Sequence, residues 1–283
     1  MINISIARKI FATIGLLAGI YAPTHAQTPE SAAQNSKKEK QQQRKQRIDQ
    51  MIRQEEEGTL IYQKQNLFAF KLYSDGWAVM FEKGFMKTVN RTTLFSVELG
   101  NRKDQKEYRL SKVDNAGFSI GNALVYGKQN NFFFAKMGIG QSYLMGGKGN
   151  KNGVAVSAVY NGGLSIGLLK PYYVDARNTA TNTVEAIKWL GDGSENDTRF
   201  LDPSALEGNS GLFKGFGEMK IKPGVFAKGA LRFDYGRYNE LISAVEAGIN
   251  LEYYASDMPI MAKNDPKKLF ANVFIAIEFG RRK

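Results

Sequence analysis

The sequence predicts an all-β protein, a closed antiparallel transmembrane β-barrel of about ten strands, within a range of eight to ten. From residue 58 onward, short segments rich in Phe, Tyr, Val and Ile alternate along the chain with Gly, Asn and Asp. The segments near the C-terminus have about ten residues or more, enough for a tilted strand to cross a bilayer. Strands of a soluble sandwich usually have about five or six. Charged residues stand well inside the strands, which favours a wet or ion-paired interior over the dry core of a sandwich.

Residues 1–26 have the order of a secretory signal peptide. Arg8 and Lys9 precede an apolar run at 10–20, and Thr24-His25-Ala26 fits the small-residue cleavage motif. The apolar run has about 11 residues, whereas a spanning helix needs about 20. We therefore expect an exported protein that begins at Gln27 and is located in the outer membrane of the cell envelope.

Residues 27–57 form a polar, mostly basic block. Only Ile48, Met51 and Ile52 are suited to burial, so we expect an exposed periplasmic arm, either a short helix or disordered. Its lysines and arginines suit an anionic membrane surface or a solvated arm, and export argues against nucleic acid as a partner. The barrel is expected to occupy residues 58–283.

Nine strands can be predicted in this region. Three near the C-terminus, at 225–235, 241–253 and 271–279, each have one wholly apolar parity, which we expect to face lipid. The other six are expected at 67–73, 77–83, 92–100, 131–140, 152–161 and 164–171. Because single-chain barrels usually have an even number of strands, a tenth is expected at 59–64 or 212–220.

Turns and connections complete the predicted barrel. Ser74-Asp75-Gly76 and Asn161-Gly162-Gly163 are expected to be tight hairpin turns. Long connections are expected at 101–130 and 172–210, the second with a helical patch at 184–189 followed by a polar loop at 191–197. Tyrosines near predicted strand ends suggest aromatic girdles at the membrane interfaces. These tyrosines are Tyr172, Tyr173, Tyr235, Tyr238, Tyr253 and Tyr254.

Three segments carry a resemblance to a known family. The runs 126–134 (YGKQNNFFF), 167–173 (GLLKPYY) and 277–283 (IEFGRRK) look like those of outer-membrane β-barrel proteins of Bacteroidota, a family largely without assigned function. The resemblance covers about residues 58–283. It implies that the last strand is the membrane-insertion signal read by the barrel-assembly machinery, an apolar strand that ends in an aromatic residue. The residues concerned are Val273, Ile275, Ile277 and Phe279, followed here by a basic tail.

The parity opposite the apolar one carries the residues expected to line the barrel interior. This set has four basic and six acidic members, and such a balance favours salt bridges that fill a narrow barrel over an ion-selective pore. The members are Lys71, Glu82, Glu98, Lys136, Lys228, Arg232, Asp234, Glu246, Glu252 and Glu278. We further expect Lys228, Arg232 and Asp234 to contact Glu246, Glu252 or Glu278 on neighbouring strands.

Composition excludes most catalytic chemistry. The chain has no Cys, and its one His, His25, lies in the predicted signal peptide, so thiolate, Ser-His-Asp and His-metal sites are not expected. We expect no metal and no cofactor. Asp234 and Glu246 are a carboxylate pair that could in principle act as acid and base, but a salt-bridge role is the simpler interpretation. The glycine-rich run 146–153 lacks the Ser or Thr and the helix of a phosphate loop, and 192–197 lacks the spacing of a calcium loop.

The sequence therefore favours a non-enzymatic barrel, an accessory or structural subunit of an outer-membrane protein assembly or secretion complex. A narrow small-solute pore is the alternative, and a His-independent lipid-modifying enzyme is the second. Outer-membrane lipids, the barrel-assembly machinery and protein subunits of an envelope complex are the expected partners.

Overall fold

The computed structural model describes residues 62–113, 119–149, 153–178, 181–236 and 240–283, together with Gln42, Arg44 and Lys45. Those three residues of the arm are helical and exposed. The predicted signal peptide, the rest of the arm and Tyr238 lie outside the described residues. None of the described helices is long and apolar enough to span a membrane.

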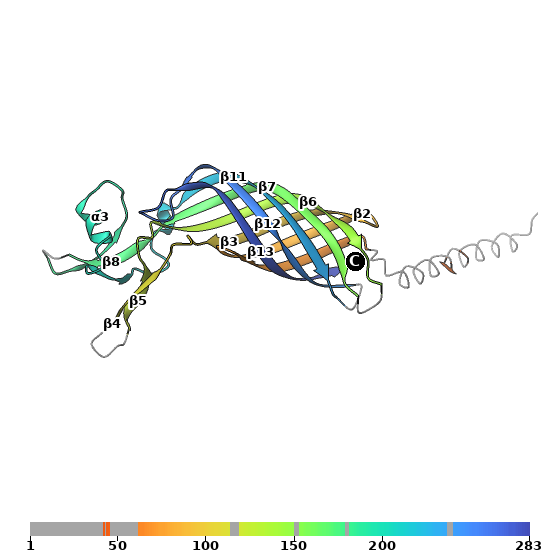
Figure 1. Ribbon diagram of the computed structural model, residues 1–283, viewed down its shortest axis with the longest axis horizontal. Coiled ribbons are helices and arrows are strands. Elements are labelled where there is room, and N and C mark those ends of the chain that lie inside the picture. Colours follow the sequence, from red (N-terminus) through yellow and green to blue (C-terminus); the bar gives the residue numbers. More distant parts are fainter. Residues whose placement is uncertain are drawn as a thin grey trace, which may run out of the picture. The chain divides into compact units, whose positions relative to one another are not determined.

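The described strands form a closed antiparallel barrel of eight strands in the order β1-β13-β12-β11-β7-β6-β3-β2 (Figure 1). Closure comes from β1, which pairs with β2 on one side and with β13 on the other. The strands are β1 (Lys64–Tyr73), β2 (Gly76–Thr88), β3 (Arg91–Arg102), β6 (Asn130–Gly146), β7 (Ala155–Pro171), β11 (Lys220–Asp234), β12 (Leu241–Met258) and β13 (Lys267–Arg282). Eight is the lower end of the expected range, and the count of ten was wrong.

Two misassigned segments explain the difference in strand count. The strands expected at 152–161 and 164–171 are one continuous strand, β7, and Asn161-Gly162-Gly163 is not a turn. A Cβ on Gly163 would lie 2.1 Å from the Met137 carbonyl oxygen, so the glycine allows a close approach of β6 to β7. Of the two places proposed for a tenth strand, 59–64 is described only from residue 62, and its last residue, Lys64, begins β1. The other, 212–220, contributes only the first residue of β11. The hairpin turn before Gly76 is present, with Tyr73 paired to Gly76.

The strands separate an apolar outside from a polar inside. On β11, Val225, Leu231 and Phe233 are exposed while Lys228 and Arg232 are buried. The same alternation runs along every barrel strand, as the exposed and buried positions of β1 illustrate. Because successive side chains in a strand point to opposite faces, the apolar set covers the outer wall and the charged set fills the interior.

The two long connections fold into a compact structure, here called the surface unit. It comprises β4 (Arg109–Val113) and β5 (Ser119–Val125), a second sheet in the order β10-β8-β9, and the helix α3 (Glu195–Phe200). The strands of the second sheet are β8 (Tyr173–Arg177), β9 (Val184–Lys188) and β10 (Leu206–Asn209). The patch expected to be helical is thus strand β9, because pairing with β8 outweighs the helix propensity of its Glu and Ala.

A separate hydrophobic core holds the surface unit together. Leu124, Val174, Ile187, Phe200 and Leu206 are buried against one another. Two hydrogen bonds join its two connections, from the Val125 amide to the Tyr172 hydroxyl (3.0 Å) and from the Tyr126 hydroxyl to the Leu201 carbonyl (2.6 Å). Burial raises the pKa of the Tyr172 hydroxyl, which keeps it protonated. The two long connections therefore contain strands, a helix and a hydrophobic core of their own.

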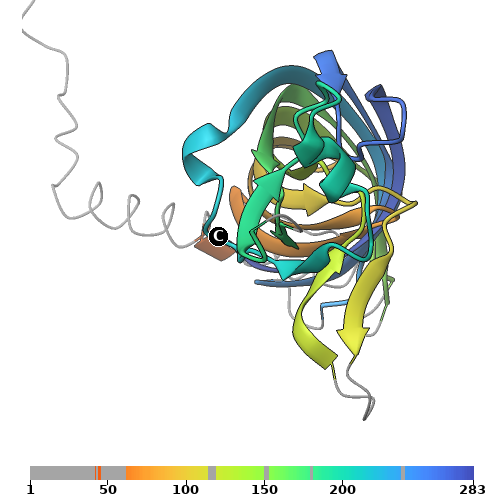
Figure 2. The ribbon, with the colours of Figure 1, turned by 90° about the vertical axis from the view of Figure 1, so that its left-hand side faces the viewer.

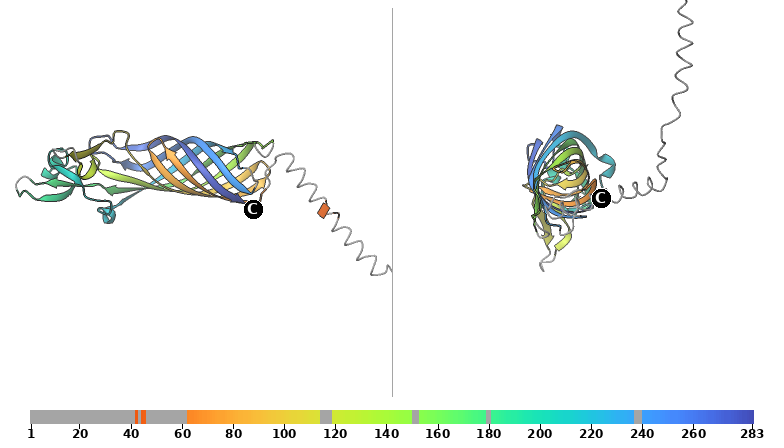
Figure 3. Two further views of the ribbon diagram at one scale, coloured as in Figure 1. Left: turned by 90° about the horizontal axis from the view of Figure 1, so that it is seen from below. Right: turned by 90° about the vertical axis from the view of Figure 1, so that its right-hand side faces the viewer.

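The two ends of the barrel differ in their connections. The end that carries residue 63 and the C-terminus has the connections at 89–90, 147–154 and 235–240. The opposite end has the turn at 74–75, the connection at 259–266 and both long connections, with the surface unit (Figures 1 and 3). We call these the terminal end and the surface-unit end.

The expected aromatic girdle is only partly present. Tyr235, just after the end of β11, and Tyr253 of β12 are exposed at opposite ends of the barrel. Tyr254 instead points into the barrel and Tyr172 into the core of the surface unit. Each adjacent Tyr pair straddles two faces, since neighbouring residues alternate in direction.

Candidate functional site

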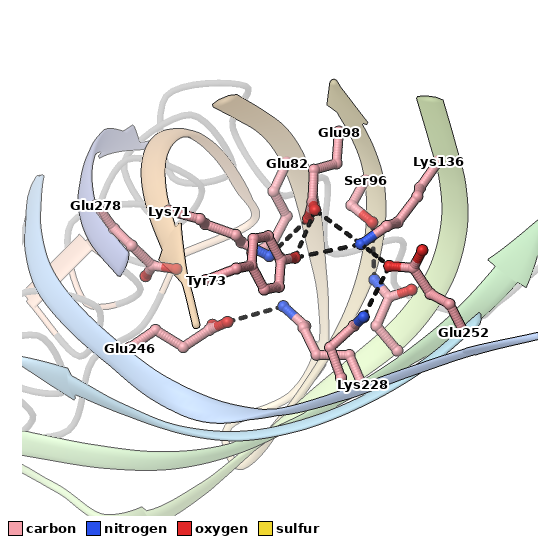
Figure 4. Close-up of polar contacts among 12 residues, drawn as sticks. Lys71, Tyr73, Glu82, Ser96, Glu98, Lys136, Lys228, Glu246, Glu252 and Glu278 are labelled. Atoms are coloured by element: carbon pink, nitrogen blue, oxygen red, sulfur yellow. Dashed lines mark hydrogen bonds and ion pairs between the residues drawn. The ribbon is translucent and has the colours of Figure 1, made fainter. Parts of the chain in front are cut away.

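All ten predicted interior residues lie inside the barrel, and none is more than 6% exposed. Charges this deeply buried are tolerated only when they are paired and hydrogen-bonded. The pairs form three groups along the barrel, described in turn below, and Figure 4 shows part of the network.

The first group surrounds Arg232 on β11. Its guanidinium contacts three carboxylates from three other strands, Glu82 (2.9 Å), Glu246 (2.8 Å) and Glu278 (2.6 Å). Glu246 lies directly opposite Arg232 in the β11–β12 register. It also accepts from Lys228, 2.8 Å away. The five planar N–H donors of arginine suit this role of a cation shared by several carboxylates.

The second group surrounds Glu98 on β3. Its carboxylate oxygens accept from Lys71 (2.8 Å), Lys136 (3.0 Å) and the Tyr73 hydroxyl (2.5 Å) (Figure 4). Lys136 is the register partner of Glu98 on β6. Lys136 also pairs with Glu252, which links this group to the third.

The third group surrounds Arg102, which the sequence-based prediction missed. Arg102 pairs with Glu252 (2.5 Å) and Asp75 (2.7 Å). Its guanidinium carbon also lies 5.2–5.5 Å from the ring centroids of Tyr73, Phe134 and Phe270. The signal for it was present, since Arg102 has the same parity as Glu98. The prediction ended that strand at residue 100, before the arginine.

Asp234 lies near the terminal end and contacts none of the three glutamates, so that part of the predicted pattern was wrong. It pairs with Lys148 (3.3 Å) and with Arg282. Arg282 belongs to β13, so the basic tail extends the last strand. Glu252 also differs from the prediction, because it pairs with Arg102 and Lys136 from the other side of the barrel.

The added residues balance the interior charge. Arg102, Lys148 and Arg282 join the four predicted cations, and Asp75 joins the six predicted acids, so that seven of each sign take part among the described residues. The near-balance predicted from sequence becomes an exact balance once the strand ends and the 147–154 connection are included. A balanced, paired set has no free charge to select ions.

The geometry leaves little room for a ligand in the interior. A cavity of about 30 Å³ opens at the terminal end, beside Arg232, Asp234 and Arg282. That volume holds only a few water molecules. Asp234 and Glu246 are each held by their own cations, so they do not form an acid/base pair. No group of three or more metal-ligating residues occurs in the described parts of the chain.

The predicted insertion strand is β13. Val273, Ile275, Ile277 and Phe279 are all exposed on the outer wall. Phe279 stands opposite Phe68 of β1 at the seam where the barrel closes. These residues thus occupy one apolar face of the strand that completes the barrel.

The segment 191–197, expected to be a polar loop, is a loop only up to Ser194, because helix α3 begins at Glu195, and its carboxylates stabilise the surface unit. Asp197 is buried, and its carboxylate accepts from the amides of Leu190 (2.8 Å) and Gly193 (3.0 Å). Asp192 accepts from the Ser194 amide (3.0 Å), and hydrogen bonds from Ser194 lower the pKa of Asp192. These carboxylates are therefore used to cap backbone donors.

Asp197→Ala is expected to destabilise the surface unit by about 1–3 kcal/mol, because two backbone donors lose their acceptor. Limited proteolysis should show faster cleavage at 190–200. Asp192→Ala is the comparison: it removes one hydrogen bond from a fully exposed carboxylate, where water can replace the acceptor, and should speed cleavage less than Asp197→Ala. Unfolding of the barrel itself should be unchanged, and a loss of barrel stability equal to that of the surface unit would contradict separate cores.

Comparison with known proteins adds distant structural likenesses. No protein-family model matches the chain, and no curated protein matches it. Among solved structures, Ail, the attachment invasion locus protein of Yersinia pestis, in complex with the heparin analogue sucrose octasulfate, is 8% identical with a TM-score of 0.35. The match covers 79% of this chain and 100% of that one.

Two further structures show likenesses of the same size. Neisserial surface protein A is 8% identical over 78% of this chain and 94% of that chain, with a TM-score of 0.32. The N-terminal β-barrel domain of Pseudomonas aeruginosa OprF is 10% identical over 77% of this chain and 100% of that chain, with a TM-score of 0.31. The strand register of this chain by itself describes an eight-stranded closed barrel.

Proposed function

We propose that the protein is a non-enzymatic β-barrel of the outer membrane that anchors a folded surface unit and serves as an accessory or structural subunit of an envelope complex. One observation carries the proposal. The barrel has an apolar outer wall and an interior filled by ion pairs, and the folded surface unit lies at one of its ends. In such a protein, the surface unit is the part that contacts partners.

The outer wall supports the membrane location. Exposed Phe70, Val97, Ile139, Leu164 and Ile275 belong to five different strands. A continuous apolar wall of this kind is favourable in lipid and unfavourable in water. A closed barrel also satisfies every interstrand hydrogen bond, which lipid requires of a membrane-spanning sheet.

The connections support an orientation. Barrels of bacterial outer membranes have short periplasmic turns and longer extracellular loops. By that rule the terminal end faces the periplasm and the surface unit faces outward. In this orientation the predicted arm at 27–57 is periplasmic. β13 is the strand that the barrel-assembly machinery reads.

The interior argues against the two alternatives. A conducting pore needs a water-filled path, whereas Arg232 and Arg102 each join carboxylates from different sides of the barrel. A lipid-modifying enzyme needs a reactive group with a base beside it, and the carboxylates of the interior are already paired with cations. Both features favour the structural role.

A detergent pull-down from native membranes tests the subunit role. Three forms of the full chain are compared: the unmodified protein, one lacking 27–57, and one with 178–205 replaced by a Gly-Ser linker. Scrambling residues 27–57 at constant composition provides the control for charge. We expect envelope-complex subunits to co-purify with the unmodified protein and to be lost in one deletion, which then identifies the binding end.

The same preparation tests the pore alternative. The purified protein is placed in a planar bilayer and its conductance is measured. Recovery of a lone monomer that conducts ions would overturn the subunit proposal and favour the pore.

A further inference from the structure

The segment 211–219 lies on the outside of the barrel wall and covers a lysine. Lys170, near the end of β7, has the parity of Leu164 and Ile166, which are exposed on the outer wall. Even so, Lys170 is only 2% exposed. Its ammonium donates to the Leu212 carbonyl and lies 4.6 Å from the centroid of the Phe216 ring. We call 211–219 the collar; its short helix η1 (Phe216–Glu218) is the cyan turn that projects sideways from the wall in Figure 2.

The collar is held in place by the chain next to it. The Tyr173 hydroxyl donates to Glu218 at 2.8 Å, and Lys188 pairs with the same carboxylate. Gly215 has φ +88°, and a Cβ there would lie 2.8 Å from the Pro171 carbonyl oxygen. The turn therefore depends on glycine to pack against the end of β7.

The collar nevertheless presents its largest apolar side chains outward. Phe213 is 90% exposed, Leu212 73% and Phe216 52%. The two phenylalanine rings lie 6.4 Å apart. Removing side chains of this size from water is favourable, so a fixed apolar cluster is stabilised by an apolar environment.

The position of the collar identifies that environment. On β7 the outer wall is apolar from Tyr160 to Leu168, and Lys170 is its first charged residue toward the surface-unit end. At a rise of about 3.3 Å per residue and a tilt of about 40°, the stretch from Tyr160 to Lys170 spans about 25 Å, the height of the apolar band in such barrels. The collar therefore lies at the edge of the hydrocarbon layer.

Charge around the collar favours an anionic headgroup. Lys188 and Lys214 have ammonium nitrogens 5.6 and 5.7 Å from the ring centroid of Tyr173. With Lys170 they place three cations around the collar, whose own carboxylate is Glu218. Aromatic and lysine side chains together are typical of the lipid headgroup level.

We propose that the collar binds a phosphorylated glycolipid of the outer leaflet, with Leu212, Phe213 and Phe216 in the acyl layer and Lys188 and Lys214 on the headgroup phosphates. The inference rests on the proposed outer-membrane function. It adds a lipid-binding site that fixes the depth of the barrel at its surface-unit end.

Native mass spectrometry of the full-length protein in detergent tests the headgroup contact. The probe is diphosphorylated lipid A, compared with its dephosphorylated form. Lys214→Gln is expected to weaken binding of the phosphorylated probe about fivefold, as expected for one lysine at an anionic surface. Lys263→Gln, an exposed lysine in the connection at 259–266, is the matched control and should leave binding unchanged. Equal binding by both variants and by both probes would overturn the proposal.

A spin label at Phe213→Cys tests the acyl contact in nanodiscs that contain lipid A. The label should be accessible to oxygen and protected from a water-soluble nickel chelate. A label at Val184→Cys, an exposed apolar position of the surface unit, should show the reverse.

The two proposals fail differently in these measurements. If the unmodified protein does not insert into bilayers at all, the outer-membrane function is wrong. If it inserts but the label at 213 remains in water, only the collar is wrong. If Phe213→Ser with Phe216→Ser turns a dimer into a monomer without changing lipid binding, the collar is a protein interface and the lipid proposal is overturned.

Discussion

Arg232→Met is expected to destabilise the folded barrel by about 3–5 kcal/mol, because it leaves buried carboxylates without their shared cation. Glu82 and Glu278 would lose their arginine partner, while Glu246 would keep Lys228. The measurement is denaturant unfolding of the reconstituted protein, together with heat-modifiable migration in mild detergent. A loss this large corresponds to more than a hundredfold in the folding equilibrium constant.

The attribution to charge can be checked by rescue. Adding Glu82→Gln and Glu278→Gln to Arg232→Met should restore much of the lost stability, since neutral amides do not repel one another. Arg91→Met, at an exposed arginine of β3, is the matched control and should change stability by less than about 0.5 kcal/mol. If Arg232→Met were as stable as the unmodified protein, the ion-pair network would not be what fills the barrel.

Leu164→Arg is expected to cost about 2–4 kcal/mol, because it places a charge in the middle of the lipid-facing band. Leu164 is 67% exposed near the middle of β7. In a water-soluble protein, an arginine at so exposed a position would change stability by no more than about 0.5 kcal/mol. Unfolding in lipid bilayers measures the difference.

The position dependence sharpens this test. Tyr160→Arg, also on the outer face of β7 but near the terminal end, should cost only about 0–1 kcal/mol. A flat profile, with both variants neutral, would contradict the membrane location and favour a soluble sandwich.

The faces of the strands could be predicted from sequence because alternation is a strong signal. Lys228, Arg232 and Glu246 stand at positions of one parity among apolar neighbours of the other. A one-residue slip would expose every one of these charges to lipid, so the register is strongly specified.

The ends of strands were harder to predict. Arg102 and Arg282 continue the inward parity of β3 and β13, yet a charge next to a predicted loop is indistinguishable from a solvated residue in sequence. Lys148 enters the interior from the connection at 147–154, where alternation gives no information about direction.

Glycine and helix propensity misled the prediction for a related reason. Gly162-Gly163 has the composition of a turn, but only the packing of β6 on β7 reveals that a strand continues through it. Val184–Lys188 contains good helix formers, and its pairing with β8 is decided by the tertiary structure. The collar has no periodic pattern, so its place on the outer wall could be found only from the contact of Lys170 with Phe216.

We propose a membrane barrel whose surface unit lies outside the cell and whose terminal end lies in the periplasm. Single-cysteine labelling tests it most directly, since the chain has no native cysteine. Thr181→Cys, in an exposed turn of the surface unit, and Val89→Cys, in the turn between β2 and β3, are treated with a membrane-impermeant maleimide. We expect Thr181→Cys to react in intact cells and Val89→Cys to react only after the outer membrane is permeabilised. Equal labelling of both in intact cells, or the reverse order, would contradict it.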